Sequence, residues 1–369
     1  MESLELIGPH FSRLSNGSLV DKVTPDMAHL IHPYWNKFEP VDSFMTKLLG
    51  TFLGTMACLS FVGNGLVVYI FSTTKSLRTP ANLLILNLAF SDFCMMATNA
   101  PMMSINLFFG TWVLGPFMCD MYAMLGSAFG ANSIWSMSMI ALDRYEVIVK
   151  GVNGRPMTIK LAVIKIIMIW TMAMFWTITP MMGWSRYVPE GNLTSCGLDY
   201  LEQDWNPKSY LIFYTIFVYL LPLFVICYSY WFIISAVAAH EKAMREQAKK
   251  MNVKSLRSSE DNEKSAEGKL AKIALVTISL WFFAWTPYGI LNFFGFFGSD
   301  VLTPTMTIWG AVFAKAGSSY NPIVYGISHP KYRIALKEKC PCCVCGETED
   351  PNAKASDATS QATNNETPA

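Results

Sequence analysis

Seven long stretches of apolar residues divide the chain. They cover approximately residues 48–74, 81–107, 117–148, 161–183, 209–238, 268–297 and 303–326. A helix needs about 20 mostly apolar residues to cross the hydrocarbon core of a bilayer. Helices of soluble proteins keep a polar face, whereas these stretches are apolar on all sides. The pattern therefore predicts an all-α membrane protein, a seven-transmembrane helix bundle.

The composition agrees with a bilayer as the solvent. Of the 369 residues, 52% are hydrophobic and 15% are charged, and the mean hydropathy is +0.30. A typical soluble domain has about 25% charged residues. The net charge is +1 and no nucleic-acid-binding motif occurs, so nucleic acid is not expected as a partner. No metal-hydrolase, catalytic-triad or phosphate-loop motif is found either, so we predict no catalytic residue, no metal and no enzyme.

Lys and Arg are concentrated in alternate connections between the spans. Examples are Lys75, Arg155, Lys249 and Lys331. Basic loops remain in the cytoplasm, which places the N-terminus outside the cell. The expected parts are an extracellular N-terminus (1–47), the seven-transmembrane bundle (48–328), a short cytoplasmic amphipathic helix (329–339) and a disordered cytoplasmic tail (340–369).

Four residues on the predicted outer side carry expected modifications. The sequons Asn16-Gly17-Ser18 and Asn192-Leu193-Thr194 predict glycosylation of Asn16 and Asn192. Cys119 begins the third span and Cys196 lies between the fourth and fifth, so both face an oxidising compartment in which disulfides persist. We expect a disulfide between them, and the alternative is two free thiols.

A lysine lies in the middle of the last span. Lys315 is surrounded in sequence by Trp309, Phe313, Ala314 and Gly317. A charged lysine at the centre of a span costs about 3 kcal/mol or more, so it marks a functional site. A buried lysine also readily becomes a neutral nucleophile, as in lysines that form Schiff bases. Position alone leaves an ion-pairing or transport lysine as the alternative.

Polar and proline residues interrupt the spans in a specific order. They are Asn64, Asp92, Asp143-Arg144-Tyr145, Pro222, Trp285-Thr286-Pro287 and Asn321-Pro322-Ile323-Val324-Tyr325. Each proline inside a span frees a backbone carbonyl and permits a kink. The pattern therefore indicates a helix bundle in which some helices can pivot.

In this order the motifs resemble those of G-protein-coupled receptors. Lys315 in Phe-Ala-Lys, six residues before Asn-Pro, resembles the lysine of opsins. The stretch from His240 to Ser259 and the run His329-Pro330-Lys331-Tyr332-Arg333 resemble the rhabdomeric opsins of arthropods. The run from Pro189 to Gly197 resembles the major visual rhodopsins of flies. The likeness covers roughly residues 14–350.

The resemblance implies a chromophore. Lys315 is expected to carry 11-cis-retinal or 3-hydroxyretinal covalently, as a protonated Schiff base. Vertebrate visual opsins have a counterion Glu three residues after the cysteine of the third span, where this chain has Tyr122, which is neutral at pH 7. The counterion is therefore expected to be Glu190, as in other invertebrate opsins. The remaining expected binding residues are Tyr122 and Asn99 as hydrogen-bonding neighbours, and Trp285, Tyr288, Phe129 and Phe224 as aromatic walls.

The resemblance also implies colour and signalling. Asn99 stands where insect ultraviolet opsins carry Lys, so visible absorption is expected. Light converts the chromophore to all-trans, the sixth helix swings outward about Pro287, and a cytoplasmic cleft accepts a Gq-type G protein. The residues expected to serve coupling and activation are Asp143, Arg144, Tyr145, Tyr230, Glu267, Asn321, Pro322, Tyr325, Asp92 and Asn64. A receptor kinase, arrestin and membrane lipid are the other expected partners, in the plasma membrane of the rhabdomere.

The cysteines of the tail and the rival functions leave alternatives open. The cluster Cys340-Pro341-Cys342-Cys343-Val344-Cys345 lacks the usual two-pair spacing of a zinc site. Palmitoylation of Cys342 and Cys343 is expected, with plain thiols as the alternative. The rival functions are a retinal photoisomerase, a retinal-driven ion pump and a receptor for a diffusible ligand. An isomerase has no use for the Asp143-Arg144-Tyr145 motif, and a pump needs more carboxylates along its spans.

Overall fold

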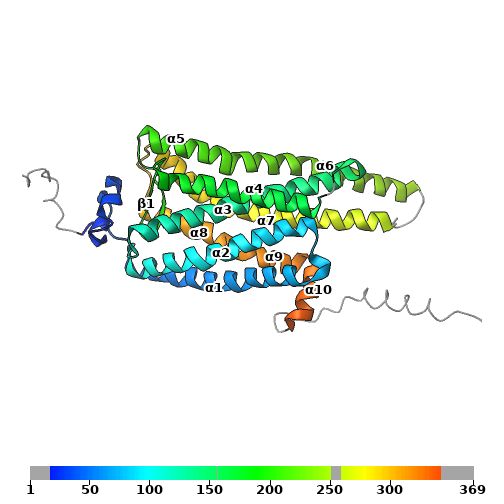
Figure 1. Ribbon diagram of the computed structural model, residues 1–369, viewed down its shortest axis with the longest axis horizontal. Helices are drawn as coiled ribbons and strands as arrows, with labels where there is room; N and C mark the ends of the chain where they lie inside the picture. The colour runs from blue at the N-terminus through cyan, green and yellow to red at the C-terminus, as the bar shows by residue number, and fades with distance from the viewer. Residues whose placement is uncertain (1–16, 156, 251–258, 342–369) are drawn as a thin grey trace, which may run out of the picture.

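The computed structural model describes residues 17–155, 157–250 and 259–341. Within these residues the chain runs back and forth along one axis in seven crossings (Figure 1). The crossings are α1 (Ser43–Thr73), α2 (Pro80–Phe109), α3 (Gly115–Tyr145), α4 (Ile159–Ile178), α5 (Trp205–Tyr214) continued by α6 (Leu221–Lys250), α7 (Ser259–Phe296), and α8 (Pro304–Ala316) continued by α9 (Tyr320–Ser328). The predicted seven-helix bundle is confirmed.

Local sequence signals set several helix ends. The Thr79 hydroxyl accepts a hydrogen bond from the N–H of Asn82, and Pro80 occupies the first turn of α2. α8 begins in the same way with Thr303 and Pro304. A capping hydroxyl satisfies an N–H that has no partner inside the helix, and proline has no N–H to satisfy. α2 ends at Gly110, whose φ of 73° is the left-handed conformation that glycine adopts without strain.

Two crossings contain irregular turns. A π-helical turn at Thr215–Leu220 joins α5 to α6, and a 3₁₀ turn at Gly317–Ser319 joins α8 to α9. Pro322 has no N–H to donate to the Ser318 carbonyl four residues earlier. That carbonyl instead accepts hydrogen bonds from Asn64 Nδ2 (2.9 Å) and from the Ser60 hydroxyl (3.1 Å), both on α1. The last crossing is thus tied to α1 next to Lys315.

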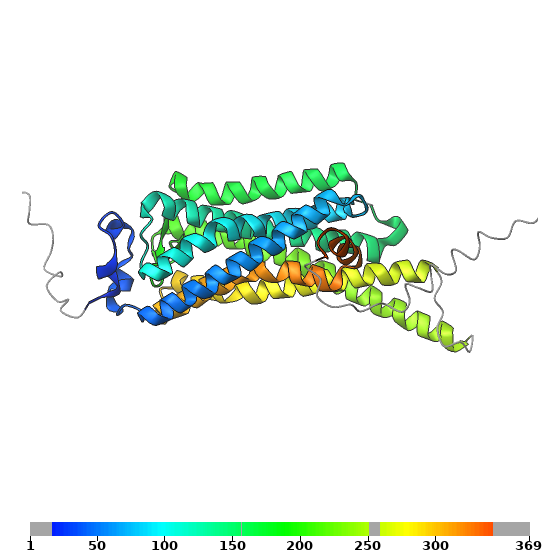
Figure 2. The ribbon, with the colours of Figure 1, turned by 90° about the horizontal axis from the view of Figure 1, so that it is seen from below.

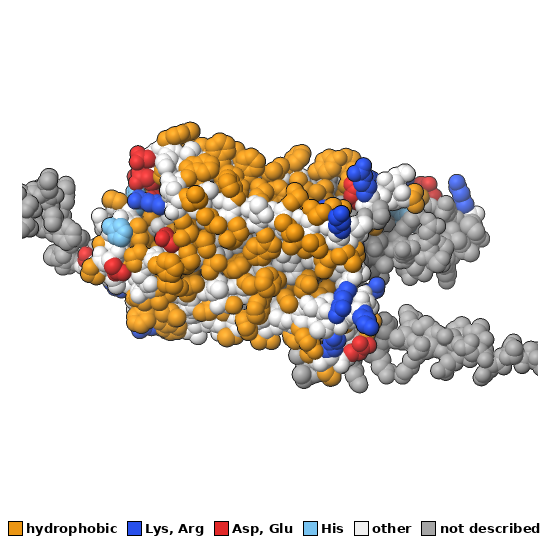
Figure 3. All heavy atoms as spheres, viewed as in Figure 1, with side chains coloured by type: hydrophobic (Ala, Val, Ile, Leu, Met, Phe, Trp, Pro, Cys, Tyr) orange, Lys and Arg blue, Asp and Glu red, His pale blue; other side chains and the backbone are white. Residues whose placement is uncertain are grey.

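The outer surface of the bundle is apolar between two charged ends (Figure 3). Among the described helices, five are long and apolar enough to span a membrane: Ser43–Thr73, Pro80–Phe109, Ile159–Met182, Trp205–His240 and Ala271–Phe296. α3 is more polar because it runs inside the bundle, where Asn132, Ser133 and Ser136 are buried. The last crossing is divided into α8 and α9, each short.

The two ends of the bundle are built differently. At one end the strands β1 (Tyr187–Glu190) and β2 (Ser195–Leu198) form an antiparallel hairpin, with Glu190 opposite Ser195. Short 3₁₀ turns at Leu19–Lys22, Ala28–Leu30 and Pro33–Lys37 lie beyond it. At the other end α10 (Pro330–Lys339) lies across the bundle axis (Figure 2). This is the short helix predicted after the last span.

Candidate functional site

Lys315 stands at the end of α8, one residue before that helix gives way to the 3₁₀ turn. Its side chain is half-buried. The ammonium nitrogen lies over the ring of Tyr122 on α3, 5.1 Å from the ring centroid. The face of an aromatic ring attracts a cation but supplies no negative charge. A full countercharge must therefore come from another element.

Glu190 of the hairpin is an acidic residue on which the charge of Lys315 acts. Its side chain is 6% exposed. Burial raises the pKa of the Glu190 carboxyl to about 7, and the positive charge of Lys315 opposes the rise. The hydroxyl of Tyr288 on α7 donates to the two carboxylate oxygens at 3.1 and 3.3 Å. Tyr288 was expected as an aromatic wall, and here it is also a hydrogen-bond donor.

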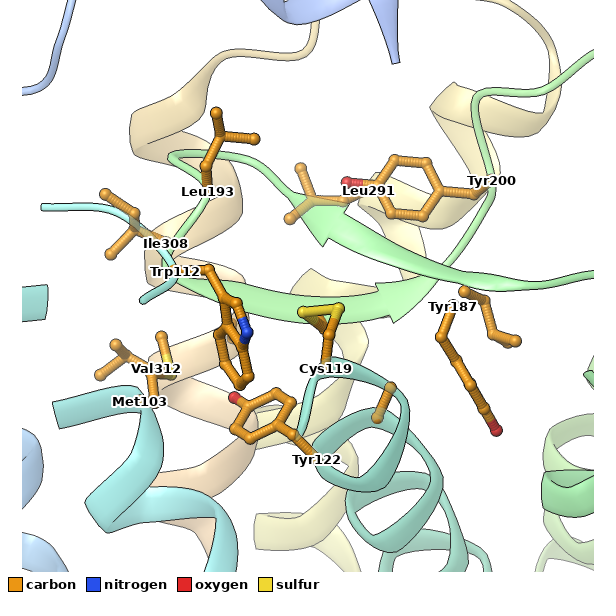
Figure 4. Close-up of a cluster of buried hydrophobic side chains, with 14 of the residues drawn as sticks. Met103, Trp112, Cys119, Tyr122, Tyr187, Leu193, Tyr200, Leu291, Ile308 and Val312 are labelled. Atoms are coloured by element: carbon orange, nitrogen blue, oxygen red, sulfur yellow. A yellow bond between two sulfur atoms is a disulfide. The ribbon is translucent and has the colours of Figure 1, made fainter. Parts of the chain in front are cut away.

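The hairpin is fixed to α3 by a disulfide. Cys119 near the start of α3 is bonded to Cys196 in β2, which confirms the predicted pairing (Figure 4). The next residue, Gly197, allows the close approach of Glu190 and Tyr288. A Cβ on Gly197 would lie 2.7 Å from the Tyr288 hydroxyl and 2.8 Å from the Glu190 carboxylate. The carboxylate can therefore occupy its place only because residue 197 has no side chain.

Asn99 and Tyr122 lie together between α2 and α3. Asn99 Nδ2 donates to the backbone carbonyl of Tyr122 at 2.6 Å. The Tyr122 hydroxyl is buried and has no hydrogen-bond partner among the described residues. A buried polar atom without a partner costs free energy, so such an atom often faces a ligand. Tyr122 keeps its expected place beside the Lys315 nitrogen, whereas Asn99 is bound to the backbone of α3.

The expected aromatic walls separate into two groups. Trp285 lies inside the bundle, where a Cβ on Gly130 of α3 would be 2.8 Å from its ring. Phe129 is buried and packs edge-on against Trp170 of α4, 6.2 Å between ring centroids. Phe224, by contrast, is 67% exposed on the apolar outer surface of α6. Phe224 is therefore not a wall of the site, because a phenylalanine in a membrane helix is equally well solvated by lipid.

The end of the bundle that carries α10, here called the inner end, holds several of the expected polar motifs. Arg144 pairs with the adjacent Asp143, and both side chains are buried. The Tyr230 hydroxyl of α6 donates to the carbonyl of Ala271 on α7 at 3.1 Å. Tyr145 contacts the ring of Tyr228 on α6, 5.7 Å between centroids. These contacts join α3, α6 and α7 near their inner ends.

A second polar network lies in the interior of the bundle, around Asp92 of α2. Asp92 accepts hydrogen bonds from Asn321 Nδ2 (2.6 Å) and from the Ser133 hydroxyl (3.1 Å). It connects α2, α3 and α9. Pro322 packs against α1, where a Cβ on Gly63 would lie 3.0 Å from its ring. The Asn-Pro motif is therefore held by Asp92 on one side and by α1 on the other.

Several expected residues lie outside what the structure describes. Asn16, Cys342 and Cys343 are outside the described residues, and the side chains of Glu267 and Tyr325 are as well. Asn192 is described and is 2% exposed, and the Thr194 hydroxyl donates to its Oδ1 at 2.9 Å. A glycan needs an accessible side-chain nitrogen, and the nitrogen of Asn192 is buried. The folded hairpin therefore does not accommodate the expected glycan at Asn192.

Sequence reasoning missed Tyr200 and Ser195, which lie near the Glu190 carboxyl and oppose the rise of its pKa. Ser195 faces Glu190 across the hairpin, and Tyr200 follows β2. No motif signals either residue. Only the hairpin register could have suggested Ser195.

Comparison with known proteins identifies the class of protein. Residues 63–325 match the family model described as 7 transmembrane receptor (rhodopsin family). The structure of squid rhodopsin superimposes with a TM-score of 0.82 at 34% identity, covering 94% of this chain and 98% of that one. The chain belongs to the rhodopsin family of seven-transmembrane receptors, and within it to the arthropod visual rhodopsins.

The most informative relatives are fly opsins. Opsin Rh1 of Calliphora vicina is 72% identical over 364 residues, which cover 99% of this chain and 98% of the relative. Opsin Rh1 of Drosophila melanogaster is 71% identical over 98% of this chain and 96% of its own length. The chain is accordingly a multi-pass membrane photoreceptor of the visual opsin type, with a retinal chromophore and a G protein as partner. It is a receptor and not an enzyme.

Proposed function

We propose that the protein is a visual photoreceptor that holds 11-cis-retinal, or its 3-hydroxy form, covalently on Lys315 and couples to a Gq-type G protein. The observation that carries the proposal is the Lys315 amine in the last crossing, together with the buried Glu190 carboxylate whose pKa responds to it. When bound, the chromophore supplies absorption of visible light and a change of shape to the all-trans form. The residues of the chain do the rest.

The residues around Lys315 fit such a group. Glu190 supplies the countercharge for a cationic nitrogen, since an opposite charge favours the charged form of its neighbour. The unpartnered Tyr122 hydroxyl offers a buried polar contact. Trp285 from α7 lies against Gly130 of α3, where the missing side chain leaves room for close packing. The hairpin and its disulfide to α3 shield the charges from outside water.

The inner motifs support the signalling part of the proposal. In the dark, the Asp143–Arg144 pair fixes the Arg144 side chain on α3, and the hydrogen bond from Tyr230 to Ala271 joins α6 to α7. Pro287 lies within α7 and permits a pivot there. A ligand that fits the two arrangements differently shifts the population toward the open one. The open form is expected to bind the G protein, and afterwards a receptor kinase and arrestin, in the rhabdomere membrane with the N-terminus outside.

Reconstitution with 11-cis-retinal tests the proposal. The purified protein is expected to form a pigment with a visible absorption maximum that changes on illumination. Borohydride reduction followed by peptide mass spectrometry should find a retinyl group on Lys315. Lys315→Ala should give no pigment, whereas Lys47→Ala, an exposed lysine on α1, should leave the spectrum unchanged. Normal pigment formation by Lys315→Ala would refute the proposal, and a near-ultraviolet maximum would refute the protonated, visible form.

A further inference from the structure

The part of α7 that follows Pro287, here called its outer part, has one face against the hairpin and the loop that follows the hairpin. The face is formed by Tyr288, Leu291 and Gly295, whose spacing of three and four residues is that of one helix face. All three follow Pro287 within α7, and Gly298 lies in the turn just after the helix ends at Phe296.

Gly295 of this face and Gly298 in the turn after it permit close contact with the loop. A Cβ on Gly295 would lie 2.3 Å from the Tyr200 ring and 3.0 Å from the Tyr200 carbonyl oxygen. The Gln203 side chain donates to the Gly295 carbonyl at 3.4 Å and lies 3.6 Å from the position of a Cβ on Gly298. The helix therefore touches the loop with its backbone, and the Tyr200 ring has no freedom to move toward α7.

Tyr200 connects this contact to the counterion. It is 3% exposed, and its ring points toward Leu291 (Figure 4). Burial and the nearby Glu190 carboxylate both raise the pKa of Tyr200. Its hydroxyl is buried without a hydrogen bond of ordinary geometry to another described atom, and Glu190 is the nearby acidic group whose charge acts on it. Tyr200 and Glu190 also line the same small cavity beneath Trp35 of the N-terminal segment.

We propose that Tyr200 is a positioning residue for the counterion, held by α7 through Leu291 and Gly295 so that its hydroxyl stabilises the ionised Glu190 carboxylate. This inference rests on the proposed function, in which Glu190 is the counterion of the Lys315 nitrogen. Glu190 is then tied to the outer part of α7 twice, directly through Tyr288 and indirectly through Tyr200. A rotation of α7 beyond Pro287 changes both contacts, so the counterion and the moving helix respond to each other.

Other polar and titratable groups lie near the Glu190 carboxylate, and a pH titration must distinguish their effects from that of Tyr200. They are Lys315 of α8, Tyr122 of α3, Tyr288 of α7, Ser195 of β2, and His32 and Asp199 at the small cavity. Asp199 is itself paired with Arg186 at 2.8 Å. Among these groups, only Tyr200 and Tyr288 connect Glu190 to α7 through a hydroxyl.

The test is a pH titration of the absorption spectrum of the reconstituted pigment. Tyr200→Phe removes only the hydroxyl, so the midpoint of the transition that belongs to Glu190 should rise by about one pH unit, the scale of one lost hydrogen bond to a charged group. Gly295→Ala should raise it in the same direction by displacing the ring. The double variant should shift no further than Tyr200→Phe alone, because Gly295→Ala acts only through the Tyr200 hydroxyl.

Matched controls exist in the same regions. Gly289→Ala adds a Cβ to α7 where nothing lies within 4 Å, and Tyr34→Phe removes an outer hydroxyl that is bonded to the Leu302 carbonyl. Both should titrate like the unmodified pigment. A Tyr200→Phe pigment that forms normally and titrates like the unmodified one would overturn the inference. If the unmodified protein forms no pigment, or Glu190→Gln keeps the same transition, the proposed function fails instead.

Discussion

At the scale of single residues, the site depends on a carboxylate placed where water cannot solvate it. Glu190 ends the first strand of the hairpin and is buried there, and the Lys315 cation and the Tyr288 hydroxyl offset the cost of burying its charge. Buried charges are tolerated when they are paired and hydrogen-bonded. The same residue therefore has opposite effects in two states of the protein. With a cation on Lys315 it is a stabilising countercharge, and without one it is a buried acid that favours its proton.

Glu190 should make the stability of the chromophore-free protein depend on pH. The pKa of its carboxyl is about 7 in the folded protein, compared with an ordinary value of 4.5. The folded state therefore binds the proton more tightly, and stability falls as pH rises from about 4.5 through 7. Glu190→Gln keeps the size and cannot ionise. The free energy of unfolding of the unmodified protein should fall relative to that of Glu190→Gln between pH 5 and pH 8, by an amount on the order of 1–3 kcal/mol. Parallel pH profiles would contradict this.

At the scale of elements, the hairpin is a short two-stranded sheet that cannot be stable alone. It is held in place by α3 through the disulfide, by α7 through Tyr288, and by the ion pair of Arg186 with Asp199. Its register puts Glu190 opposite Ser195 and next to the cystine. A shift of one residue would turn the carboxylate to the other face. The disulfide thus sets the position of the Glu190 carboxylate as well as the stability of the loop.

Removing the disulfide should destabilise the protein and disturb the site. The bond closes a segment with a sequence separation of 77 residues. The loss of chain entropy in the unfolded state for such a loop is worth about 4 kcal/mol. The pair Cys119→Ser and Cys196→Ser should therefore lower the thermal midpoint strongly and reduce pigment yield. Cys58→Ser, an exposed free cysteine on α1, serves as the control and should change neither. Unchanged stability of the double variant would show that packing alone holds the hairpin.

At the scale of the whole molecule, α7 is constrained near both ends. Its outer face contacts the hairpin and Tyr200, and its inner part accepts the hydrogen bond from Tyr230 at Ala271. Pro287 lies between these two regions. Because Pro287 separates the two regions, the part of α7 before the proline can pivot relative to the part that contacts the hairpin. The arrangement therefore suits a two-state bundle in which a change at one end is expressed at the other.

Breaking the buried ion pair at the inner end should raise signalling in the dark. Asp143→Asn removes the charge that holds Arg144, and G-protein nucleotide exchange by the unilluminated pigment should rise about tenfold, equivalent to roughly 1.4 kcal/mol. Asp300→Asn removes an exposed charge that pairs with Lys37, and such pairs contribute little. It should leave dark exchange unchanged. Equal dark activity of Asp143→Asn and the unmodified pigment would show that this pair does not hold the inactive state.

The sequence alone determined the number of crossings, the class of protein and the key amine. Apolar stretches of membrane length allow no other backbone arrangement than helices, because the bilayer offers no hydrogen-bond partners to the backbone. A lysine in the middle of a span is costly enough to be conspicuous. The pairing of Cys119 with Cys196 also followed, because the alternation of the spans brings both to the same end of the bundle.

Tertiary structure decided what each residue faces. Phe224 and Trp285 are both aromatic residues within apolar spans, yet Phe224 contacts lipid and Trp285 the interior. In a bilayer both faces of a helix are apolar, so hydrophobicity does not distinguish them. Asn192 carries a glycosylation motif but is buried by the hairpin. Tyr200 meets Glu190 only because α7 and the loop converge there, and such long-range contacts leave no periodic signal in the sequence.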